Sequence, residues 1–343
     1  MRILLVMDPG ILVPPKTYGG HERLVAMFAK AYKRLGHDVD LLVTDGSSVE
    51  GCTIYTIGKE GFPPSRKEMV LALAKAWKFL WIHRKRYDLI HNFGRLAYLI
   101  PILNHPVKKI MTYGREISSK NIDLIHRLPN RNIVFTGCSN NLVSRVVKKG
   151  RWEVVYNAIE FDKYTLNEKV DEDAPLIFLG RLERVKGVHT AIQVAKATNN
   201  RLIISGNISP LADERNYFET EIAPYIDGDR IKYIGALNDD KKNQYLSSAI
   251  ALLFPIEWNE PFGMVMVEAM ACGTPVIAFK QGSVDEVVDD GVTGYKVSNL
   301  KEMGDAVQEV KKIDRILCRK HAAARFDVTI IARRYLSISD EFF

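Results

Sequence analysis

The feature that most constrains the fold is an alternation of short apolar strands with amphipathic helices, which occurs twice along the chain. Residues 3–7 form the first apolar strand, an apolar-periodic helix is expected at about 21–35, and a second strand follows at 39–43. A strand, a helix and a strand in this order form a βαβ unit, and such units build parallel sheets. The alternation restarts at 176–179 after the polar segment 168–175, which predicts two domains joined by a linker.

Length and composition agree with two globular domains. The chain has 343 residues, of which 47% are apolar and 26% are charged, and this is enough for two domains that each bury a core. The four cysteines lack metal-like spacing, and we interpret them as reduced thiols of a cytoplasmic protein. Residues 3–6 are too short for the core of a signal peptide, and we expect no membrane-spanning segment.

The net charge of +7 is unevenly distributed. Residues 1–160 carry 25 Lys and Arg against 13 Asp and Glu, whereas residues 161–343 carry 23 against 28. A basic first half indicates an anionic partner. The candidates are a membrane surface, a phospholipid-linked acceptor and a nucleic acid.

The segment 66–86 is expected to be a basic helix with an apolar stripe. Apolar residues recur at i, i+3 and i+4 spacing, namely Val70, Leu73, Ala74, Trp77, Leu80 and Trp81. The cations are Arg66, Lys67, Lys75, Lys78, Arg84, Lys85 and Arg86. Two interpretations remain open: a segment that lies at a membrane interface, or a stripe that packs on the sheet beneath a solvated basic face.

The stretch 254–275 carries the clearest site pattern. A strand end leads through a polar loop with Glu260 to an apolar helix with Glu268, which ends near Gly273. The N–H groups expected to face an anion at the helix N-terminus belong to Phe262, Gly263 and Met264. One carboxylate reaches a neutral polyol beside that anion, so the pattern predicts a site for a phosphate with sugar on both sides.

This block, E260-P-F-G-M-V-M-V-E268, resembles the E-x7-E signature of retaining family 4 glycosyltransferases, the group 1 enzymes of GT-B fold. The resemblance implies that Glu268 holds the donor ribose and that Glu260 faces the transferred sugar. The stretch G180-R-L-E-R-V-K-G187 resembles the family's G-R-L-x-x-x-K-G, which implies that Arg181 and Lys186 bind the donor diphosphate. Arg184 between them is interpreted as a surface residue.

Two further stretches are compared with the same family. The sequence Y18-G-G-H-E-R23 resembles its G-G-x-E-R, which implies that Gly19 and Gly20 approach the donor or the acceptor. At Tyr113-Gly114, many relatives have a histidine and a glycine, and that histidine contacts the transferred sugar. The candidates to replace it here are Tyr113, Arg115 and Glu116.

The fold that the resemblance implies is α/β with GT-B architecture, in which two Rossmann-like domains with parallel sheets face each other across a cleft. We expect residues 1–160 to bind the acceptor and residues 161–322 to bind the nucleotide-sugar donor. We expect residues 323–343 to form a C-terminal helix that crosses back to the first domain.

The implied function is a metal-independent retaining glycosyltransferase of hexosyltransferase type that needs no cofactor. It moves a sugar from a nucleoside-diphosphate sugar to a hydroxyl of a sugar, lipid-linked or polysaccharide acceptor, in the synthesis of a glycolipid, polysaccharide or other glycoconjugate. The expected location is the cytoplasm, peripheral at the inner face of the membrane, with no nucleic-acid partner. Two alternatives stay open: a nucleotide-sugar 2-epimerase of the same fold, and a non-catalytic protein that binds nucleotide-sugars.

Overall fold

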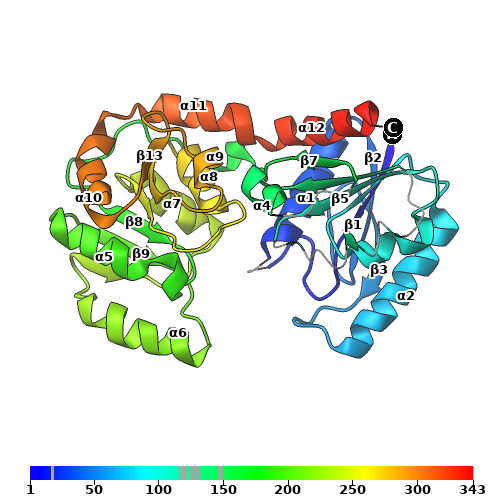
Figure 1. The fold of residues 1–343 in the computed structure, drawn as a ribbon, viewed down its shortest axis with the longest axis horizontal. Helices are drawn as coiled ribbons and strands as arrows, with labels where there is room; N and C mark the ends of the chain where they lie inside the picture. The colour runs from blue at the N-terminus through cyan, green and yellow to red at the C-terminus, as the bar shows by residue number, and fades with distance from the viewer. Residues whose placement is uncertain are drawn as a thin grey trace. The chain divides into compact units, whose positions relative to one another are not determined.

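The computed structural model describes residues 1–16, 19–115, 117, 122–123, 127, 132–145 and 150–342. The chain forms two compact units, one of Met1–Ala158 with Val328–Phe343 and one of Ile159–Asp327. Each unit is built on a parallel sheet, of seven strands in the first and six in the second. The predicted α/β class with two Rossmann-like sheets is therefore confirmed (Figure 1).

The unit boundaries differ in detail from the expected ones. The first division falls after Ala158, two residues before the expected position. The C-terminal segment that belongs with the first unit begins at Val328 rather than at residue 323. The reason is that helix α11 (Arg315–Phe326) continues to Phe326, whose side chain is completely buried in the second unit.

The sheet of the first unit has the strand order β3-β2-β1-β4-β5-β6-β7. Its strands are β1 (Arg2–Val6), β2 (Asp38–Thr44), β3 (Thr53–Gly58), β4 (Leu89–Asn92), β5 (Lys108–Tyr113), β6 (Ile133–Gly137) and β7 (Trp152–Val154). The helical segments of this unit are α1 (Gly20–Arg34), α2 (Arg66–His83), η1 (Leu96–Ile102), α4 (Asn140–Ser144) and α12 (Val328–Glu341). The central strands β1 and β4 are almost wholly buried, as expected when helices cover both faces of such a sheet.

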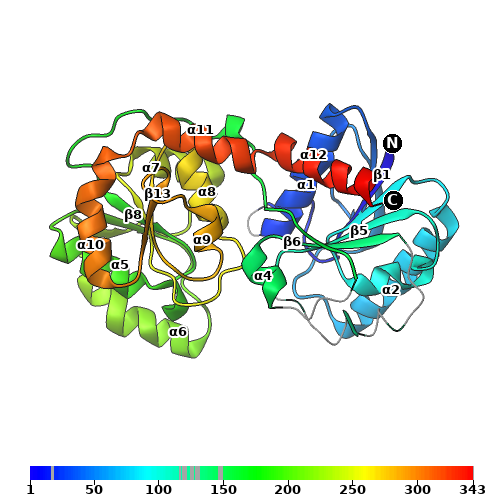
Figure 2. The ribbon, with the colours of Figure 1, turned by 45° about the horizontal axis from the view of Figure 1, so that its top comes forward.

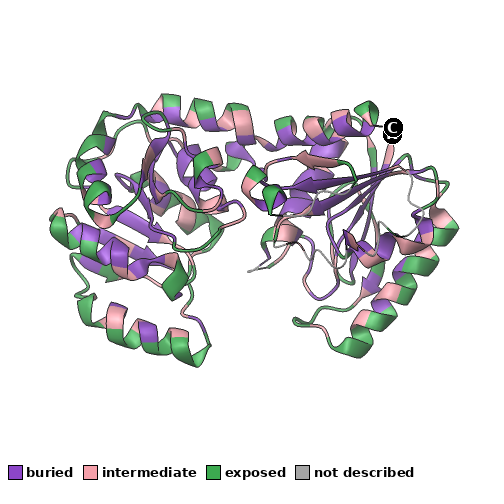
Figure 3. Cartoon of the chain, in the orientation of Figure 1, coloured by how far each residue is buried: buried purple, intermediate pink, exposed green. Residues whose placement is uncertain are grey.

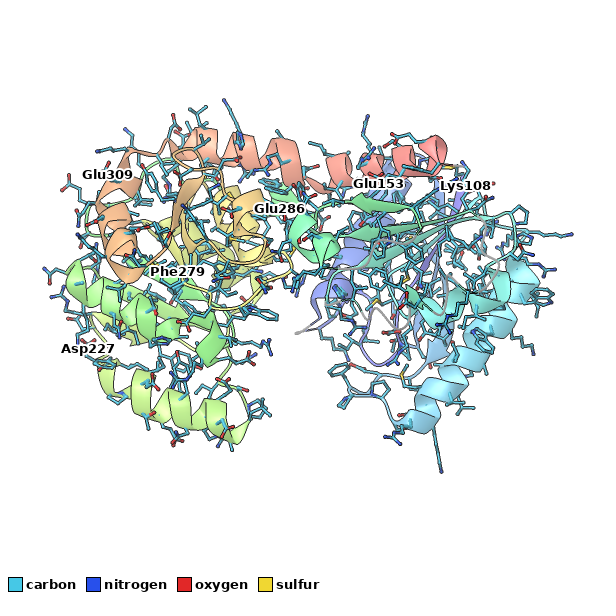
Figure 4. All side chains as sticks on the ribbon, in the orientation of Figure 1. Lys108, Glu153, Asp227, Phe279, Glu286 and Glu309 are labelled. Carbon is cyan, nitrogen blue, oxygen red and sulfur yellow. The ribbon has the colours of Figure 1, made fainter. Side chains whose placement is uncertain are left out.

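The C-terminal helix α12 packs beside α1 (Figures 1 and 2). Its Tyr335 is buried and meets Phe28 of α1 edge to face, with ring centroids 5.3 Å apart. Two ion pairs join α12 to strands of the same unit, Lys108 with Asp340 at 3.4 Å and Glu153 with Arg334 at 3.0 Å. Figure 4 labels Lys108 and Glu153, the two members on the strands. Because exposed ion pairs contribute little, we attribute the attachment of α12 mainly to its buried side chains, Tyr335 among them.

Helix α2 corrects one sequence interpretation. Ala72, Ala76 and Leu80 are the buried residues of this helix. The predicted stripe is mostly on the other side, since Val70, Ala74, Trp77 and Trp81 are exposed, and of its members only Leu80 is fully buried. The interpretation that this stripe packs on the sheet is therefore correct for Leu80 and Leu73, which lie in and against the core, and wrong for the four exposed members. The periodicity was misleading because two alanines, which carry little apolar signal, form much of the packed side.

The sheet of the second unit has the order β10-β9-β8-β11-β12-β13. Its strands are β8 (Leu176–Leu179), β9 (Leu202–Ser205), β10 (Ile231–Tyr233), β11 (Leu252–Phe254), β12 (Val276–Phe279) and β13 (Gly294–Val297). Its α-helices are α5 (Val188–Ala197), α6 (Ala212–Tyr217), α7 (Asp239–Ser248), α8 (Met264–Ala271), α9 (Val284–Val287), α10 (Leu300–Glu309) and α11. Strand order reverses between β8 and β11, which creates a topological switch point.

One buried histidine makes the stability of the first unit depend on pH. His91 on β4 is completely buried, with Tyr32 Oη 3.0 Å from Nδ1 and Thr112 Oγ1 2.8 Å from Nε2. Burial lowers the pKa of His91 to about 3. The neutral ring is therefore the form that this core accepts.

We expect acid to weaken the first unit through His91. Its folded pKa lies below the unfolded value of about 6.5, so the unfolded chain binds the additional proton as the pH falls from 6.5 towards 3. The unfolding free energy should then fall by about 1.4 kcal/mol per pH unit for this one proton. His91→Gln should remove that contribution in urea unfolding followed between pH 6 and pH 4. Equal pH slopes in the two proteins would contradict this.

Candidate functional site

A cavity of about 250 Å³ opens at the switch point of the second unit. Strands β8 and β11 are neighbours, with Ile177 paired to Leu252, and both end at this cavity. Ligands of open α/β sheets bind outside the carboxyl ends of the strands at such a point. The lining includes six of the predicted site residues: Arg181, Lys186, Glu260, Gly263, Met264 and Glu268.

Glu260 is held by one of its two carboxylate oxygens. Oε2 lies 2.5 Å from Lys186 Nζ and accepts a hydrogen bond of 2.9 Å from Trp258 Nε1. The lysine ammonium also lies over the Trp258 ring, 4.7 Å from its centroid. Oε1 makes no hydrogen bond to any residue that the structure describes. The carboxylate is therefore fixed in direction and retains an acceptor for a ligand.

Glu268 on α8 is held in the same way. Its exposed fraction is only 8%, and a carboxylate so buried needs partners. Oε1 lies 2.6 Å from Lys242 Nζ and 3.1 Å from the Tyr164 hydroxyl. Within the described part of the chain, Oε2 has no hydrogen-bond partner. Burial and the nearby Glu268 charge raise the pKa of Tyr164 well above its usual value, so its hydroxyl remains a donor.

Sequence reasoning did not identify Lys242 and Tyr164. Lys242 lies on α7 and Tyr164 follows the short helical turn Phe161–Lys163, and Tyr164 is 104 positions from Glu268. Neither residue belongs to a motif. The signal that was available is the buried position expected for Glu268, which requires a cation or donors but does not say where in the chain they are.

Gly263 shapes the loop between the two glutamates. Gly263 has φ +76° and is the N-cap of α8, with no side chain capping the first turn. A Cβ there would lie 2.6 Å from Met266 Cε. The first amides of α8 therefore remain open to an anion at the positive end of the helix. The Phe262 side chain is not part of the cavity wall, since it is buried and packs edge to face on Phe326 with ring centroids 5.7 Å apart.

The two arginines near Lys186 have different roles in the structure. Arg181 lines the cavity, is half exposed and pairs with Glu183 at 2.7 Å. Arg184 pairs with Glu221 instead and stacks over the Tyr217 ring, 4.6 Å from its centroid. Arg184 is not among the cavity residues, in agreement with its interpretation as a surface residue.

Gly19 and Gly20 lie in the first unit, where α1 begins. Gly19 is the N-cap of α1 with φ +147°, and a Cβ there would lie 2.8 Å from Pro15 Cβ. Gly20 is the first residue of the helix and has open space on its Cβ side. Gly19 therefore brings the backbone close to its surroundings, and both glycines belong to a different unit from the cavity.

The position of the family histidine is also in the first unit. Tyr113 is half buried in an aromatic stack, with its ring centroid 5.8 Å from Trp152 and 6.5 Å from Phe135. Arg115 is exposed and pairs with Asp8 at 3.3 Å, and Glu116 lies outside the described residues. Sequence reasoning missed His21, whose ring meets Gly114 so closely that a Cβ on this glycine would overlap Nε2. Burial and the Arg115 charge lower the pKa of His21.

No helix in the described ranges combines the length and apolar character that crossing a membrane requires. The described residues also contain no group of three or more His, Cys, Asp or Glu side chains placed to hold a metal ion.

Gly282 gives a test of how the Glu260 loop is held. It has φ +60°, a Cβ there would overlap the Glu260 backbone, and Ser283 N donates to Glu260 O at 3.1 Å. We expect Gly282→Ala to reduce the unfolding free energy by several kcal/mol, because it adds this overlap to a backbone cost of about 1–2 kcal/mol. The matched control is Gly291→Ala, with φ +74° and open space, which should show only the backbone cost. Urea unfolding of both variants measures the difference, and equal losses would show that Gly282 does not hold this loop.

Two family models match consecutive regions of the chain. The model described as Glycosyltransferase Family 4 matches residues 18–163, and the model described as Glycosyl transferases group 1 matches residues 162–326. An uncharacterised glycosyltransferase of Methanocaldococcus jannaschii is 25% identical over 329 residues, which cover 83% of this chain and 82% of the relative.

Two solved structures resemble the whole chain. Sucrose-phosphate synthase from Thermosynechococcus elongatus has a TM-score of 0.75 at 22% identity and covers 99% of this chain and 98% of its own. The Anabaena protein HepE in complex with UDP-glucose has a TM-score of 0.73 at 19% identity and covers 99% of this chain and 100% of its own. At these identities the likeness establishes the fold, and the predicted GT-B fold is confirmed.

Proposed function

The chain belongs to the group 1 glycosyltransferases, and from that premise we propose that it is a retaining enzyme which moves a sugar from a nucleoside-diphosphate sugar to an acceptor hydroxyl. The observation that carries this proposal is that two glutamates line one cavity. In each, one carboxylate oxygen is bound to a lysine and the other has no hydrogen bond among the described residues. The second unit binds the donor, and the first unit binds the acceptor.

In this proposal Glu268 recognises the ribose. Its Oε1 is occupied by Lys242 and Tyr164, and Oε2 is left to accept hydrogen bonds from sugar hydroxyls. An ionised carboxylate is an acceptor without donors, which suits it to the two donor hydroxyls of a ribose. The ion pair with Lys242 offsets part of the cost of burying this carboxylate.

The diphosphate is bound by Arg181, Lys186 and the first amides of α8. Lys186 has three N–H donors, so it can hold Glu260 and a phosphate oxygen at the same time. Arg181 provides a planar fork for a second phosphate contact. These groups stabilise the charge that develops on the departing diphosphate.

The reaction proceeds on one face of the sugar. Retaining glycosidases use two carboxyl groups about 5–5.5 Å apart, one of which is the nucleophile. Here Glu260 is already bound to a lysine and a tryptophan, and Glu268 is bound to a lysine and a tyrosine. We therefore propose that the bond from the anomeric carbon to the phosphate breaks as the bond to the acceptor oxygen forms. The acceptor proton passes to the leaving phosphate.

The proposed donor is a UDP-hexose, and the proposed acceptor is a sugar, a lipid-linked sugar or a polysaccharide. The Anabaena protein of the same fold, which was solved with UDP-glucose, supports a uridine donor. No metal ion enters the proposed mechanism, because the cationic side chains and the helix N-terminus supply the charge stabilisation.

We expect one nucleoside diphosphate to stabilise the protein against thermal unfolding. UDP, GDP and ADP are compared, and a ligand present at about 100 times its Kd should add about 2.7 kcal/mol. Glu268→Gln should reduce the shift because it removes the charged acceptor for the ribose. Each variant is compared with its own ligand-free state, since the substitution also affects the contact with Lys242. An unchanged shift in the variant would contradict the ribose role.

Lys186→Ala should lower kcat by about 10² to 10³, the usual cost of removing one group that stabilises transition-state charge. Arg184→Ala is the matched control, because Arg184 is two positions away but pairs with Glu221 outside the cavity. Turnover is measured as nucleotide release with and without acceptor, and the anomeric configuration of the product is read by NMR. Wild-type turnover in the lysine variant would show that Lys186 does not stabilise the transition state. If the product is instead the 2-epimer of the donor and forms without acceptor, the protein is an epimerase and not a transferase.

A further inference from the structure

The first unit has an unusual surface along helix α2 (Arg66–His83). Large apolar side chains are exposed on this helix, with exposed fractions of 66% for Val70, 61% for Leu71, 54% for Trp81 and 58% for Ile82. Figure 3 shows α2 with exposed residues along its length and buried residues on the side towards the sheet. Clusters of exposed large apolar residues mark interaction sites in soluble proteins.

The exposed side does not result from poor packing of the helix. The opposite side is anchored by Ala72, Ala76 and Leu80, which belong to the core of the first unit. Phe79 also packs inward, with its ring centroid 4.6 Å from that of Tyr55. Ser65 caps the N-terminus with a complete capping box that includes Glu68. The helix is therefore fixed with its other face towards solvent.

Cations share this face with the apolar residues. Residues 66–86 contain seven Lys and Arg and one acidic residue, Glu68. Lys67 and Lys78 are exposed and lie at about the same helical angle, roughly 60° from the row of Val70 and Trp81. Lys85 is also exposed and lies in the turn that follows the helix. Arg84 stacks on Trp81, 3.9 Å from the ring centroid. The surface of α2 and of the turn after it that carries Val70, Leu71, Trp81, Ile82, Lys67, Lys78 and Lys85 is called here the α2 face.

We propose that the α2 face binds flat on an anionic lipid bilayer. A helix of 18 residues is about 27 Å long and lies in the interface with its apolar side chains among the acyl chains. Tryptophan favours this interface, and lysines extend their stems along apolar surface while their ammonium groups reach the headgroups. Each cation near an anionic surface adds to the attraction, which salt weakens.

The composition of the face selects a bilayer over a nucleic acid. Phosphates of a nucleic acid would use the lysines but would leave Val70, Leu71 and Ile82 exposed to water. A bilayer satisfies both groups of side chains. The surface goes beyond the proposed function, because binding to lipid requires neither donor nor acceptor.

The test is sedimentation of the full chain with vesicles of phosphatidylcholine alone or with 30% phosphatidylglycerol. We expect binding to the anionic vesicles, weakened by 0.5 M salt, and little binding to the neutral ones. The double variant Lys78→Glu/Lys85→Glu should bind at least tenfold more weakly. Its matched control is Lys301→Glu/Lys320→Glu, which reverses two exposed lysines of the second unit and should bind as the wild type does.

Trp81→Ser tests the apolar part of the face. It should weaken vesicle binding at both salt concentrations, while thermal unfolding stays near that of the wild type because the side chain is exposed. The proposal is overturned if anionic vesicles do not sediment the protein, or if the control pair weakens binding as much as the α2 pair. It is also overturned if a DNA or RNA oligonucleotide binds through the α2 lysines and Trp81→Ser leaves vesicle binding unchanged. Donor binding by the second unit is measured separately, so failure here leaves the proposed transfer reaction unaffected.

Discussion

The candidate site depends on two lysine–glutamate pairs in the second unit. Lys186 holds Glu260 at 2.5 Å, and Lys242 holds Glu268 at 2.6 Å. In each pair the lysine and one further donor occupy a single carboxylate oxygen, so the other oxygen has no hydrogen bond within the described residues. A partly buried carboxylate without such a partner would carry a large desolvation cost. The pairs thus lower the cost of placing two carboxylate acceptors at one cavity.

The parallel sheet explains why these groups meet. Reversal of strand order between β8 and β11 leaves a crevice at their carboxyl ends, and the loops after both strands turn into it. Close backbone contacts then fix the conformation of these loops. At Gly187, for example, a Cβ would overlap Pro255 O. Arg319 contributes from α11 by donating to Phe161 O and Tyr164 O, each at 2.7 Å. The hydroxyl that contacts Glu268 is therefore positioned by an arginine that does not line the cavity.

Local sequence was sufficient for the parts of the fold and site that local motifs encode. The strand–helix alternation predicts the two parallel sheets, and the spacing of Glu260 and Glu268 predicts a loop and a helix that the structure contains. Lys242 and Tyr164 could not be found in this way, because they contact Glu268 from positions distant in sequence. His21 lies in the quoted stretch 18–23, but its contact with Gly114 cannot be seen from the sequence. The expected burial of a carboxylate predicts that it has a partner, but it does not identify the lysine that is this partner.

Helix α2 shows the corresponding limit of hydrophobic periodicity. The spacing of Val70, Ala74, Trp77 and Trp81 is that of a helix side, and the helix was correctly expected. Periodicity does not say which side faces the core when small residues such as Ala72 and Ala76 allow close packing against the sheet. The large residues Val70 and Trp81 then remain exposed.

The most direct test of the central claim is a crystal structure of the chain with the nucleoside diphosphate that binds it most tightly. The account predicts ribose hydroxyls within hydrogen-bond distance of Glu268 Oε2, with Lys242 and Tyr164 still on Oε1. It also predicts phosphate oxygens on Lys186, Arg181 and the amides at the start of α8. A nucleotide bound elsewhere, or a ribose without contact to Glu268, would contradict the assignment of this cavity as the donor site.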